Sequence, residues 1–315
     1  MDHSKSKRHV YIVDDEQNGR RLDRVIRAQQ GNVPQALIEK WARSKSLLVN
    51  SQPSKPNQRL NMGDEVSWPD VTDVIKLRST ENRKQNLSHQ EIDIVFRAKS
   101  FLVLNKPSGL ASQGGSGLNY SVDDWLTSLD GHWKLVHRLD RATSGCLLVA
   151  RGAKATEHFA QQFRERSTCK FYLALVKDWW GEQTGYIDVP LRRRDDVSRK
   201  SFVEVHPEGD SASTYFHYLG GNGEQHLMLL RPLTGRMHQL RVHMASKGTP
   251  IIGDSLYGGH EAKRLALHAL CLSVMDQDDN RHWMTANPGL DYKHLAPDLM
   301  KYIPDQDILE ALGDV

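Results

Sequence analysis

The stretch LVHRLDRATSGCLLVA, residues 135–150, places charged side chains where a pair of buried strands is expected. Its apolar ends, 135–136 and 146–149, have the character of strands, and Thr143-Ser144-Gly145 supplies turn residues between them. The polar segment 137–141 is therefore held by apolar chain on both sides. This arrangement predicts a polar loop fixed at the edge of a sheet.

Within this loop Asp140 is flanked by Arg138 and Arg141. Burying a charge costs several kcal/mol unless it is paired, so a carboxylate held beside two arginines requires an explanation. One interpretation is a structural ion pair that holds the turn, and the other is a functional site. Spacing alone leaves both interpretations open, because ion-pair networks perturb carboxylates without any chemistry.

The segment HRLDRATSG followed by LLVA resembles the signature of the RluA family of RNA pseudouridine synthases, in which the Asp of HRLD is the catalytic group. Three further stretches follow the order of that family: NKPSGL at 105–110, KFYLA at 170–174 and LTGRMHQLRVH at 233–243. Together they cover the chain from about residue 92 to about residue 272. A motif with this many fixed side chains is far more specific than a lone glycine-rich loop.

The resemblance implies an α+β protein with the pseudouridine synthase fold, a mixed and mainly antiparallel central sheet with flanking helices. It makes Asp140 the nucleophile or ribose-directed carboxylate and Arg236 its ion-pair partner. Tyr172 would stack on the uracil and is the candidate to handle the proton at C5. Arg138 matches the position that fills the vacated base stack in relatives, although it could equally bind phosphate. An isomerisation of uridine needs no cofactor.

Residues 20–69 resemble a small S-four-type RNA-binding domain, also called the alpha-L motif. Two helices are predicted there by apolar residues at helical spacing, and a short strand, a turn at Asn50-Ser51 and a second strand follow. The resemblance places the second helix and the turn after it against RNA, at Lys40, Arg43 and Lys45. Residues 1–19 are expected to be flexible, 70–90 to be a linker and 91–315 to form the catalytic domain.

The net charge of +3 hides an asymmetry along the chain. Residues 20–68 hold nine Lys and Arg against four Asp and Glu, a local +5, whereas residues 276–315 hold three against nine, a local −6. Binding to a polyanion is therefore expected to be local, and not a property of the whole surface. The acidic end of the chain predicts only one short terminal helix.

Composition excludes several other classes of protein. No apolar run has the length of a membrane helix, and the start MDHSKSKRH lacks the apolar core of a secretory signal. Three cysteines without a CxxC pair suggest neither disulfides nor zinc, and His238 and His243 are spaced too unfavourably to share one metal. We expect a monomer in a bacterial cytoplasm, in preference to a mitochondrion or plastid.

The leading hypothesis is a pseudouridine synthase acting on structured RNA, most of all large-subunit (23S) ribosomal RNA. The domain order resembles the bacterial large-subunit enzymes of classes C and D, and the loop QGGSG at 113–117 favours class C. A non-catalytic RNA-binding protein on the same fold is the first alternative. A hydrolase that uses Asp140 with His137 is the second, and it is disfavoured because glycosidases need two carboxylates.

Overall fold

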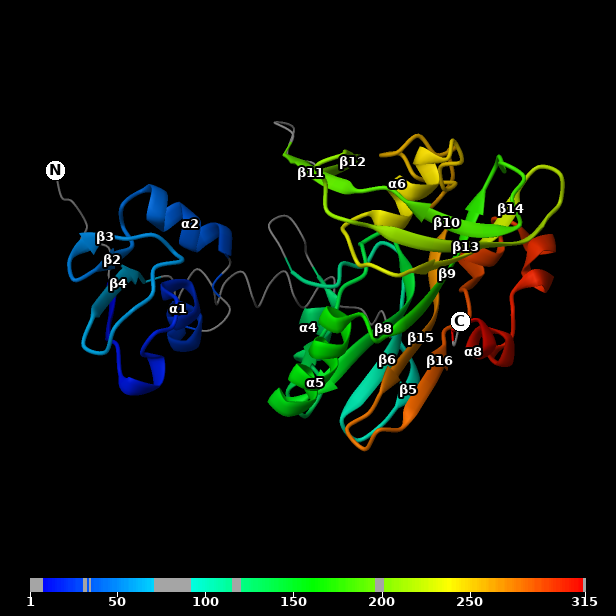
Figure 1. Cartoon of the computed structure of the whole chain (residues 1–315). Helices are drawn as coiled ribbons and strands as arrows, with labels where there is room; N and C mark the ends of the chain where they lie inside the picture. Colours follow the sequence, from blue (N-terminus) through cyan, green and yellow to red (C-terminus); the bar gives the residue numbers. More distant parts are fainter. Residues whose placement is uncertain are drawn as a thin grey trace. The chain divides into compact units, whose positions relative to one another are not determined.

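The computed structural model describes residues 8–30, 33, 35–70, 92–114, 120–195 and 201–313 (Figure 1). Two compact units divide the chain, with the boundary after residue 91. Most of the expected linker, residues 71–90, and residues 115–117 of the glycine-rich loop lie outside the described residues. In the described part of the chain, no helix has both the length and the apolar character needed to cross a bilayer.

The N-terminal unit has a four-stranded antiparallel sheet and two helices. Leu22, Val25 and Ile26 are fully buried along one face of the first helix, which confirms the helix predicted from their spacing. The sheet has the order β1-β4-β2-β3. The elements are β1 (Arg8–Ile12), η1 (Asp15–Gln17), α1 (Leu22–Gln30), α2 (Gln35–Arg43), β2 (Leu48–Val49), β3 (Gln52–Pro53) and β4 (Glu65–Pro69).

Strand β1 corrects the expectation that residues 1–19 are flexible. It pairs in antiparallel register with β4, from Arg8 opposite Pro69 to Ile12 opposite Glu65. It escaped prediction because its apolar residues do not follow its burial: exposed and partly buried positions alternate along the strand, but Val10 and Ile12 occupy exposed positions, at 56% and 64%. Residues 1–7 lie outside the described part of the chain.

The second unit is organised around one large mixed sheet, with strand order β10-β13-β14-β9-β15-β8-β6-β5, to which β16 and β7 add at β15 and β8. Among its described strands, only β8 and β15 pair in parallel. The strands are β5 (Asp93–Arg97), β6 (Phe101–Lys106), β7 (Trp133–Leu135), β8 (Ser144–Arg151), β9 (Cys169–Val176), β10 (Thr184–Asp188), β13 (Ser213–Gly221), β14 (His226–Pro232), β15 (Leu267–Met275) and β16 (Arg281–Thr285).

Helices and a small hairpin complete this unit. The predicted helix near residues 153–164 is confirmed as α5 (Gly152–Glu165), and the one expected at 236–247 begins slightly later as α6 (Gln239–Ser246). The sheet and its flanking helices confirm the expected α+β class. The remaining elements are α4 (Val122–Leu126), the hairpin β11 (Leu191–Asp195) and β12 (Ser201–Val205), α7 (Leu290–Lys293), η2 (Pro297–Tyr302) and α8 (Gln306–Gly313).

The acidic end of the chain is more structured than expected. The single terminal helix is confirmed as α8, but β16, α7 and η2 precede it. Tyr292, Leu299 and Leu309 are almost fully buried against the large sheet. The apolar residues of this segment are too widely spaced for a local pattern to reveal that they pack on distant strands.

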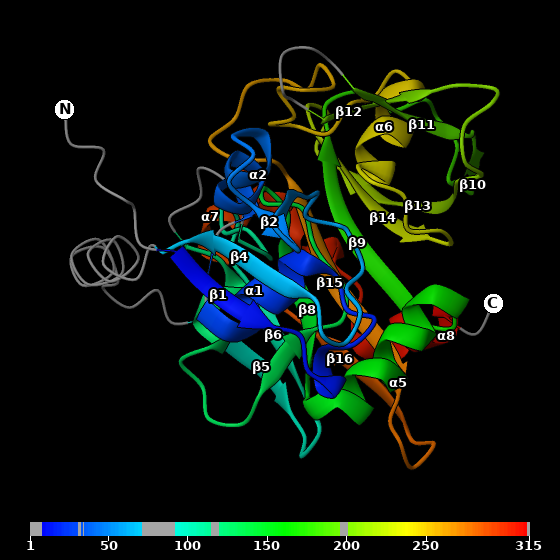
Figure 2. The same cartoon turned by 90° about the vertical axis from the view of Figure 1, so that its left-hand side faces the viewer.

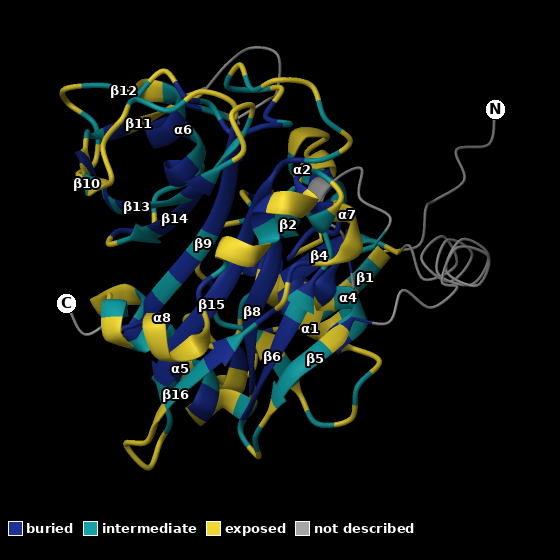
Figure 3. Ribbon diagram, turned by 90° about the vertical axis from the view of Figure 1, so that its right-hand side faces the viewer, coloured by how far each residue is buried: buried dark blue, intermediate teal, exposed yellow. Residues whose placement is uncertain are grey.

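Two hydrophobic clusters lie along the large sheet, and buried strands dominate its centre in Figure 3. One gathers β9, β14, β15 and α6, and the other gathers β5, β6, β8 and α5. Strand β9 is a long strand that follows α5 (Figure 2). Its residue Tyr172 is only partly buried and packs against both clusters. The ring of Tyr172 therefore lies where the two halves of the unit meet.

Candidate active site

The loop between β7 and β8, which contains Asp140, is bonded tightly to the segment that follows β6. Ser112 Oγ donates to the carbonyl of Leu139 at 2.8 Å and accepts from its amide at 3.1 Å. Ser108 Oγ donates to the Ala142 carbonyl at 2.7 Å. Leu139 directly precedes Asp140 and Ala142 follows it two residues later, so the backbone that carries the carboxylate is held on both sides.

Lys106 strengthens this connection from inside the protein. Its fully buried ammonium donates to the carbonyls of Pro107, Leu110 and Arg141 at 2.9, 2.8 and 3.3 Å. Burial, together with the charge of Arg264, lowers its pKa to about 7. Three carbonyl acceptors match the three N–H groups of the ammonium form, so the site favours the charge that burial disfavours.

Gly145, the last residue of the sequence Thr-Ser-Gly, lies where the loop returns to the sheet, at a position that requires glycine. It pairs with Ala269 in the parallel contact of β8 with β15 and has a φ of 107°. A Cβ at this position would meet the Ala269 carbonyl oxygen at 2.1 Å. Only glycine allows both this conformation and this approach. The turn therefore brings the loop of Asp140 against the strand at the centre of the sheet.

The loop opens into a cavity of about 750 Å³ formed within the second unit. Asp140 is the only acidic residue among its described lining residues. Basic side chains surround it on several segments, and such a lining favours a polyanionic ligand. The basic lining residues are Arg138, Arg141, Arg164, Arg166, Lys170, Arg236 and Arg241, with His137 and His238 beside them.

Arg241, on α6, is the arginine that approaches Asp140. Its Nη1 lies 3.8 Å from Asp140 Oδ2. The same guanidinium binds Asp254 through two bonds, Nε to Oδ2 at 2.7 Å and Nη2 to Oδ1 at 2.6 Å. Asp254 is fully buried and also accepts from the amides of Leu256 and Tyr257. Arg241 is thus oriented from behind and presents its remaining N–H groups to Asp140.

His238 approaches the same carboxylate oxygen, with Nε2 at 3.8 Å from Asp140 Oδ2. Its Nδ1 lies 2.8 Å from the hydroxyl of Tyr257, which accepts from the Val203 amide at 3.0 Å. Within the described residues, Nδ1 is the one available acceptor for the phenol proton, so this network places the imidazole proton on Nε2. Burial lowers the pKa of His238 and favours this neutral form.

Arg236 does not make the expected ion pair with Asp140. It lines the cavity, but its guanidinium lies 3.3 Å from Asp210 and donates to the Ser211 carbonyl. The physical reason is its place in the loop before α6, where Gln239 accepts from its amide. Arg241, on α6, and His238, the residue directly before that helix, instead approach the carboxylate. The signal in the sequence that could have identified them was their place in the motif LTGRMHQLRVH, close to Arg236.

Tyr172 and Arg138, both proposed from the sequence, line the cavity together with Asp140. Burial and the nearby charge of Asp140 raise the pKa of Tyr172, so the phenol stays protonated near neutral pH. Arg138 is exposed, and no hydrogen bond or ion pair engages its side chain within the described chain. The aromatic face and the free guanidinium therefore lie on the same opening as the carboxylate.

His137 does not suit the hydrolase alternative. Its Nε2 accepts from the Leu148 amide at 2.9 Å, and its ring stacks on Phe163 with centroids 4.2 Å apart. Burial and the charge of Lys170 lower its pKa to about 3. The imidazole is therefore neutral, and its Nε2 accepts a hydrogen bond from a backbone amide. It is not available to act as a base alongside Asp140.

The bases predicted in the N-terminal unit lie at the end of α2 and just after it. Lys40, Arg43 and Lys45 are all exposed, and Lys45 has a positive φ of 53°. No ion pair neutralises these three side chains in the part of the chain that the structure describes. They form a basic surface on a unit with its own core.

Comparison with known proteins gives a consistent result. The family model described as RNA pseudouridylate synthase matches residues 100–246. The chain is 34% identical over 298 residues to "Ribosomal large subunit pseudouridine synthase C" of Vibrio parahaemolyticus, covering 89% of this chain and 92% of that protein. It is 37% identical over 284 residues to the protein of the same name from Salmonella typhimurium, covering 84% and 87%.

Solved structures agree in fold. The structure of "Human RNA Pseudouridylate Synthase Domain Containing 1" matches with a TM-score of 0.58 and 26% identity, over 72% of this chain and 96% of that one. The segments that line the cavity, from the loop of Asp140 to α6, fall largely within the residues matched by the family model.

Proposed function

This chain belongs to the RNA pseudouridine synthase family, and from that premise we propose that it isomerises uridines of large-subunit ribosomal RNA. The observation that carries the proposal is the position of Asp140, the one acid among the described residues that line a largely basic cavity, close to Arg241 and His238. The substrate is taken from the names of the bacterial relatives, and the cavity has the charge that an RNA strand requires.

The reaction breaks the bond between ribose C1′ and uracil N1, turns the base and joins C1′ to C5. N1 gains a proton and C5 loses one, so the overall composition is unchanged and no external redox partner or cofactor is required. Asp140 is assigned to the ribose, as the nucleophile or as the carboxylate that stabilises positive charge there. Arg241, held by Asp254, is assigned to keep that carboxylate ionised and oriented.

Tyr172 is assigned to the base. Its ring is positioned at the junction of the two hydrophobic clusters, where it can stack on a uracil that enters the cavity. Because its pKa is raised, its neutral hydroxyl is suited to donate a hydrogen bond and poorly suited to remove the C5 proton. A uridine must leave its helix to reach these residues, and Arg138 is assigned to the space that it leaves.

A tritium-release assay with uracil labelled at C5 tests the catalytic assignment. We expect release by the wild-type chain and none above background by Asp140→Asn, which keeps the shape of the side chain but removes its charge. Tyr186→Phe, at a residue 59% exposed and outside the cavity lining, is the matched control and should retain full activity. Equal release by wild type and Asp140→Asn would refute the role of Asp140.

The target RNA is tested separately. Ribosomal RNA from a strain lacking this protein should lose defined pseudouridines in a carbodiimide primer-extension map, and the wild-type chain, but not Asp140→Asn, should restore them. An unchanged map would refute the ribosomal assignment while leaving the in vitro activity intact. Such a substrate also implies a bacterial cytoplasmic location. We further propose that the protein is a monomer, which light scattering can check.

We further propose that the N-terminal unit is an S-four-type RNA-binding domain extending from Arg8 to Asp70. Two helices followed by short antiparallel strands support this assignment, and Lys40, Arg43 and Lys45 supply its basic surface. Its proposed role is to hold the RNA while the second unit performs the reaction, with a linker within residues 70–90 joining the two units.

Neutralising this surface should weaken RNA binding and flatten its dependence on salt. The triple variant Lys40→Gln, Arg43→Gln, Lys45→Gln should reduce the slope of log affinity against log salt by up to about 2–3 if each base contacts a phosphate. Lys55→Gln, an exposed lysine elsewhere in the same unit, is the control. A slope unchanged in the triple variant would contradict the proposed RNA contact.

A further inference from the structure

Most basic residues around the cavity already have partners in the protein. Arg236 pairs with Asp210, Arg241 with Asp254 and Arg164 with Glu157. Arg141 donates to the Gly109 carbonyl at 2.9 Å. These side chains are held by the protein itself, so their presence in the cavity is explained without any ligand.

Lys170 and Arg166 differ from these residues. In the described part of the chain, neither side chain makes a hydrogen bond or ion pair, although both line the cavity. The Lys170 ammonium lies 5.9 Å from the centroid of the Phe163 ring, whose other contact is the stacked ring of His137. A half-buried ammonium packed beside aromatic rings loses solvation without gaining an acceptor.

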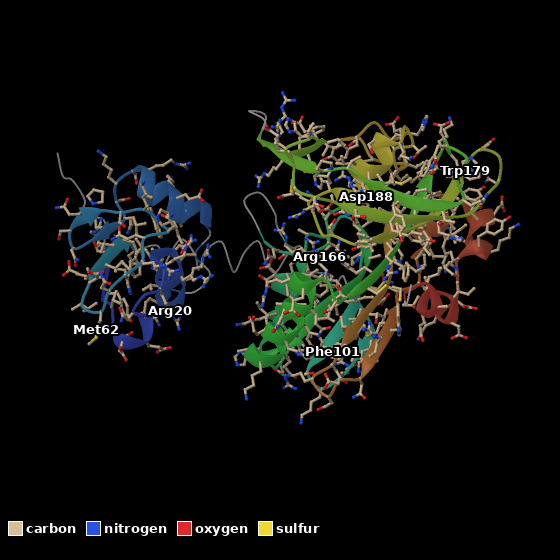
Figure 4. The ribbon with its side chains drawn as sticks, viewed as in Figure 1. Arg20, Met62, Phe101, Arg166, Trp179 and Asp188 are labelled. Atoms are coloured by element: carbon tan, nitrogen blue, oxygen red, sulfur yellow. The ribbon has the colours of Figure 1, made fainter. Side chains whose placement is uncertain are left out.

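The electrostatic surroundings of Lys170 have the same character. Burial lowers its pKa, and the nearby charge of Arg166 lowers it further. Arg166, labelled in Figure 4, follows the last residue of α5 in a left-handed conformation with φ 61°. Holding two like charges at one wall of a cavity is unfavourable unless an anion lies between them. Within the described residues, the two positive charges at this wall are therefore not compensated by a negative charge.

The position of Lys170 relative to Tyr172 indicates which anion fits. The two residues are alternate members of β9, and both line the cavity, whereas Phe171 between them is fully buried. Residues two apart on a strand are roughly 7 Å apart on one face. In a nucleotide whose base stacks on Tyr172, the sugar-phosphate backbone lies at about this distance from the base. The Lys170 ammonium would thus lie close to that backbone.

We propose that Lys170 and Arg166 form a binding site for one phosphodiester of the RNA strand, adjacent to the uridine that enters the cavity. This inference rests on the proposed function, because it takes the base to be held at Tyr172. The site lies at the wall formed by the end of α5 and the start of β9, whereas Arg241 and His238 belong to the segment around α6. It holds the RNA strand at that wall. It contributes to holding the extruded nucleotide and not to the chemistry at the ribose.

Binding is measured in the Asp140→Asn background, so that turnover does not alter the RNA. The ligand is an RNA oligonucleotide that contains a uridine identified in the primer-extension map. We expect Lys170→Met and Arg166→Gln each to weaken binding about tenfold at low salt. Each should also reduce the salt slope by about 0.7–0.9, the value for one lost phosphate contact.

Lys177→Met is the matched control, because Lys177 follows the other end of β9, is exposed and does not line the cavity. Lys170→Arg should restore most of the binding lost in Lys170→Met. Thermal unfolding of every variant separates loss of the site from loss of the fold. If Lys170→Met bound RNA no more weakly than Lys177→Met, the phosphate site would be refuted.

A neutral methylphosphonate, placed in turn on the 5′ and 3′ side of the uridine, locates the contact. At one of these positions it should weaken binding to the Asp140→Asn chain but cause no further loss with Lys170→Met added. Equal losses in both backgrounds at both positions would overturn the proposal. Failure of the proposed function is recognised independently, as an absence of tritium release by the wild-type chain.

Discussion

Asp140 is approached by two groups at the start of α6, Arg241 on the helix and His238 directly before it, and each of these is held by a different residue. Asp254 orients Arg241, and Tyr257 orients His238. Each group that approaches Asp140 is thus paired with a supporting residue. The supporting residue can be substituted while the group that faces Asp140 is kept. This makes the contributions of Arg241 and His238 separable by experiment.

Arg241 should matter far more to the chemical step than Arg236. Lysine cannot bind Asp254 through two parallel bonds and still reach Asp140, so Arg241→Lys should lower kcat about 100-fold. Arg236→Lys, which changes a residue paired with an exposed aspartate, should alter mainly KM. Single-turnover tritium release distinguishes the two. A larger fall in kcat for Arg236→Lys than for Arg241→Lys would restore the original expectation.

Tyr257→Phe should change the pH dependence of the reaction. The phenol donates to the unprotonated Nδ1 of His238, which favours the neutral imidazole, so losing the donor should raise the pKa of His238. Any limb of the kcat profile that reports His238 should therefore move to higher pH, with kcat lower by roughly tenfold below neutrality. Tyr215→Phe is the control, and an identical profile for Tyr257→Phe and wild type would count against this role.

At the scale of elements, the hairpin β2-β3 contains a local conflict between sequence and structure. Its two turn residues, Asn50 and Ser51, have φ values of 50° and 62°. Asn50 is secured by bonds to Asp64 and to the amide of Glu65, whereas Ser51 has no such support within the described residues. Glycine adopts such a φ without strain, so Ser51 is the residue of this turn that its conformation disfavours.

Ser51→Gly should stabilise the N-terminal unit by about 0.5–1 kcal/mol, since glycine adopts a positive φ without strain. Denaturant unfolding followed by the fluorescence of Trp41 and Trp68, both buried in this unit, provides the measurement. Ser44→Gly, at the end of α2, is the comparison and should be destabilising or neutral. A loss of stability in Ser51→Gly would contradict the observed turn geometry.

Most helices and the strands on either side of Asp140 could be predicted, because their apolar spacing is local. The parallel pairing of β8 with β15 could not, since it joins residues more than a hundred positions apart and is visible only in the close approach at Gly145. The same limit applied to the site. Asp140 and Tyr172 were proposed from motifs, and both line the cavity, but which arginine faces the carboxylate depends on how α6 packs against the loop of Asp140.

At the scale of the whole molecule, the two units have separate cores. Among the described residues of the N-terminal unit, the buried apolar cluster runs from Val13 to Trp68. The clusters of the second unit begin at Ile92. Each unit therefore has a core of its own among the described residues, and we expect damage to one core to leave the other intact.

Ile38→Ala tests this independence. Truncating a fully buried isoleucine should cost the N-terminal unit about 2–5 kcal/mol. We expect KM for RNA to rise while kcat at saturating RNA stays within about twofold of wild type. Leu173→Ala, in the core of the second unit, should instead reduce kcat together with the stability of that unit. If Ile38→Ala abolished turnover even at saturation, the separation of roles would be wrong.

The bonds that Lys106, Ser108 and Ser112 make around the loop of Asp140 have a consequence for which uridines can react. With Asp140 assigned to the ribose, we expect the nucleic acid to supply the movement, because a loop bonded at Leu139, Arg141 and Ala142 is poorly placed to carry its carboxylate outward to a base that stays within its helix. Sites where the pyrimidine is already weakly paired would open with the least work. The rigidity of one short loop thereby favours strained or looped RNA over regular duplex.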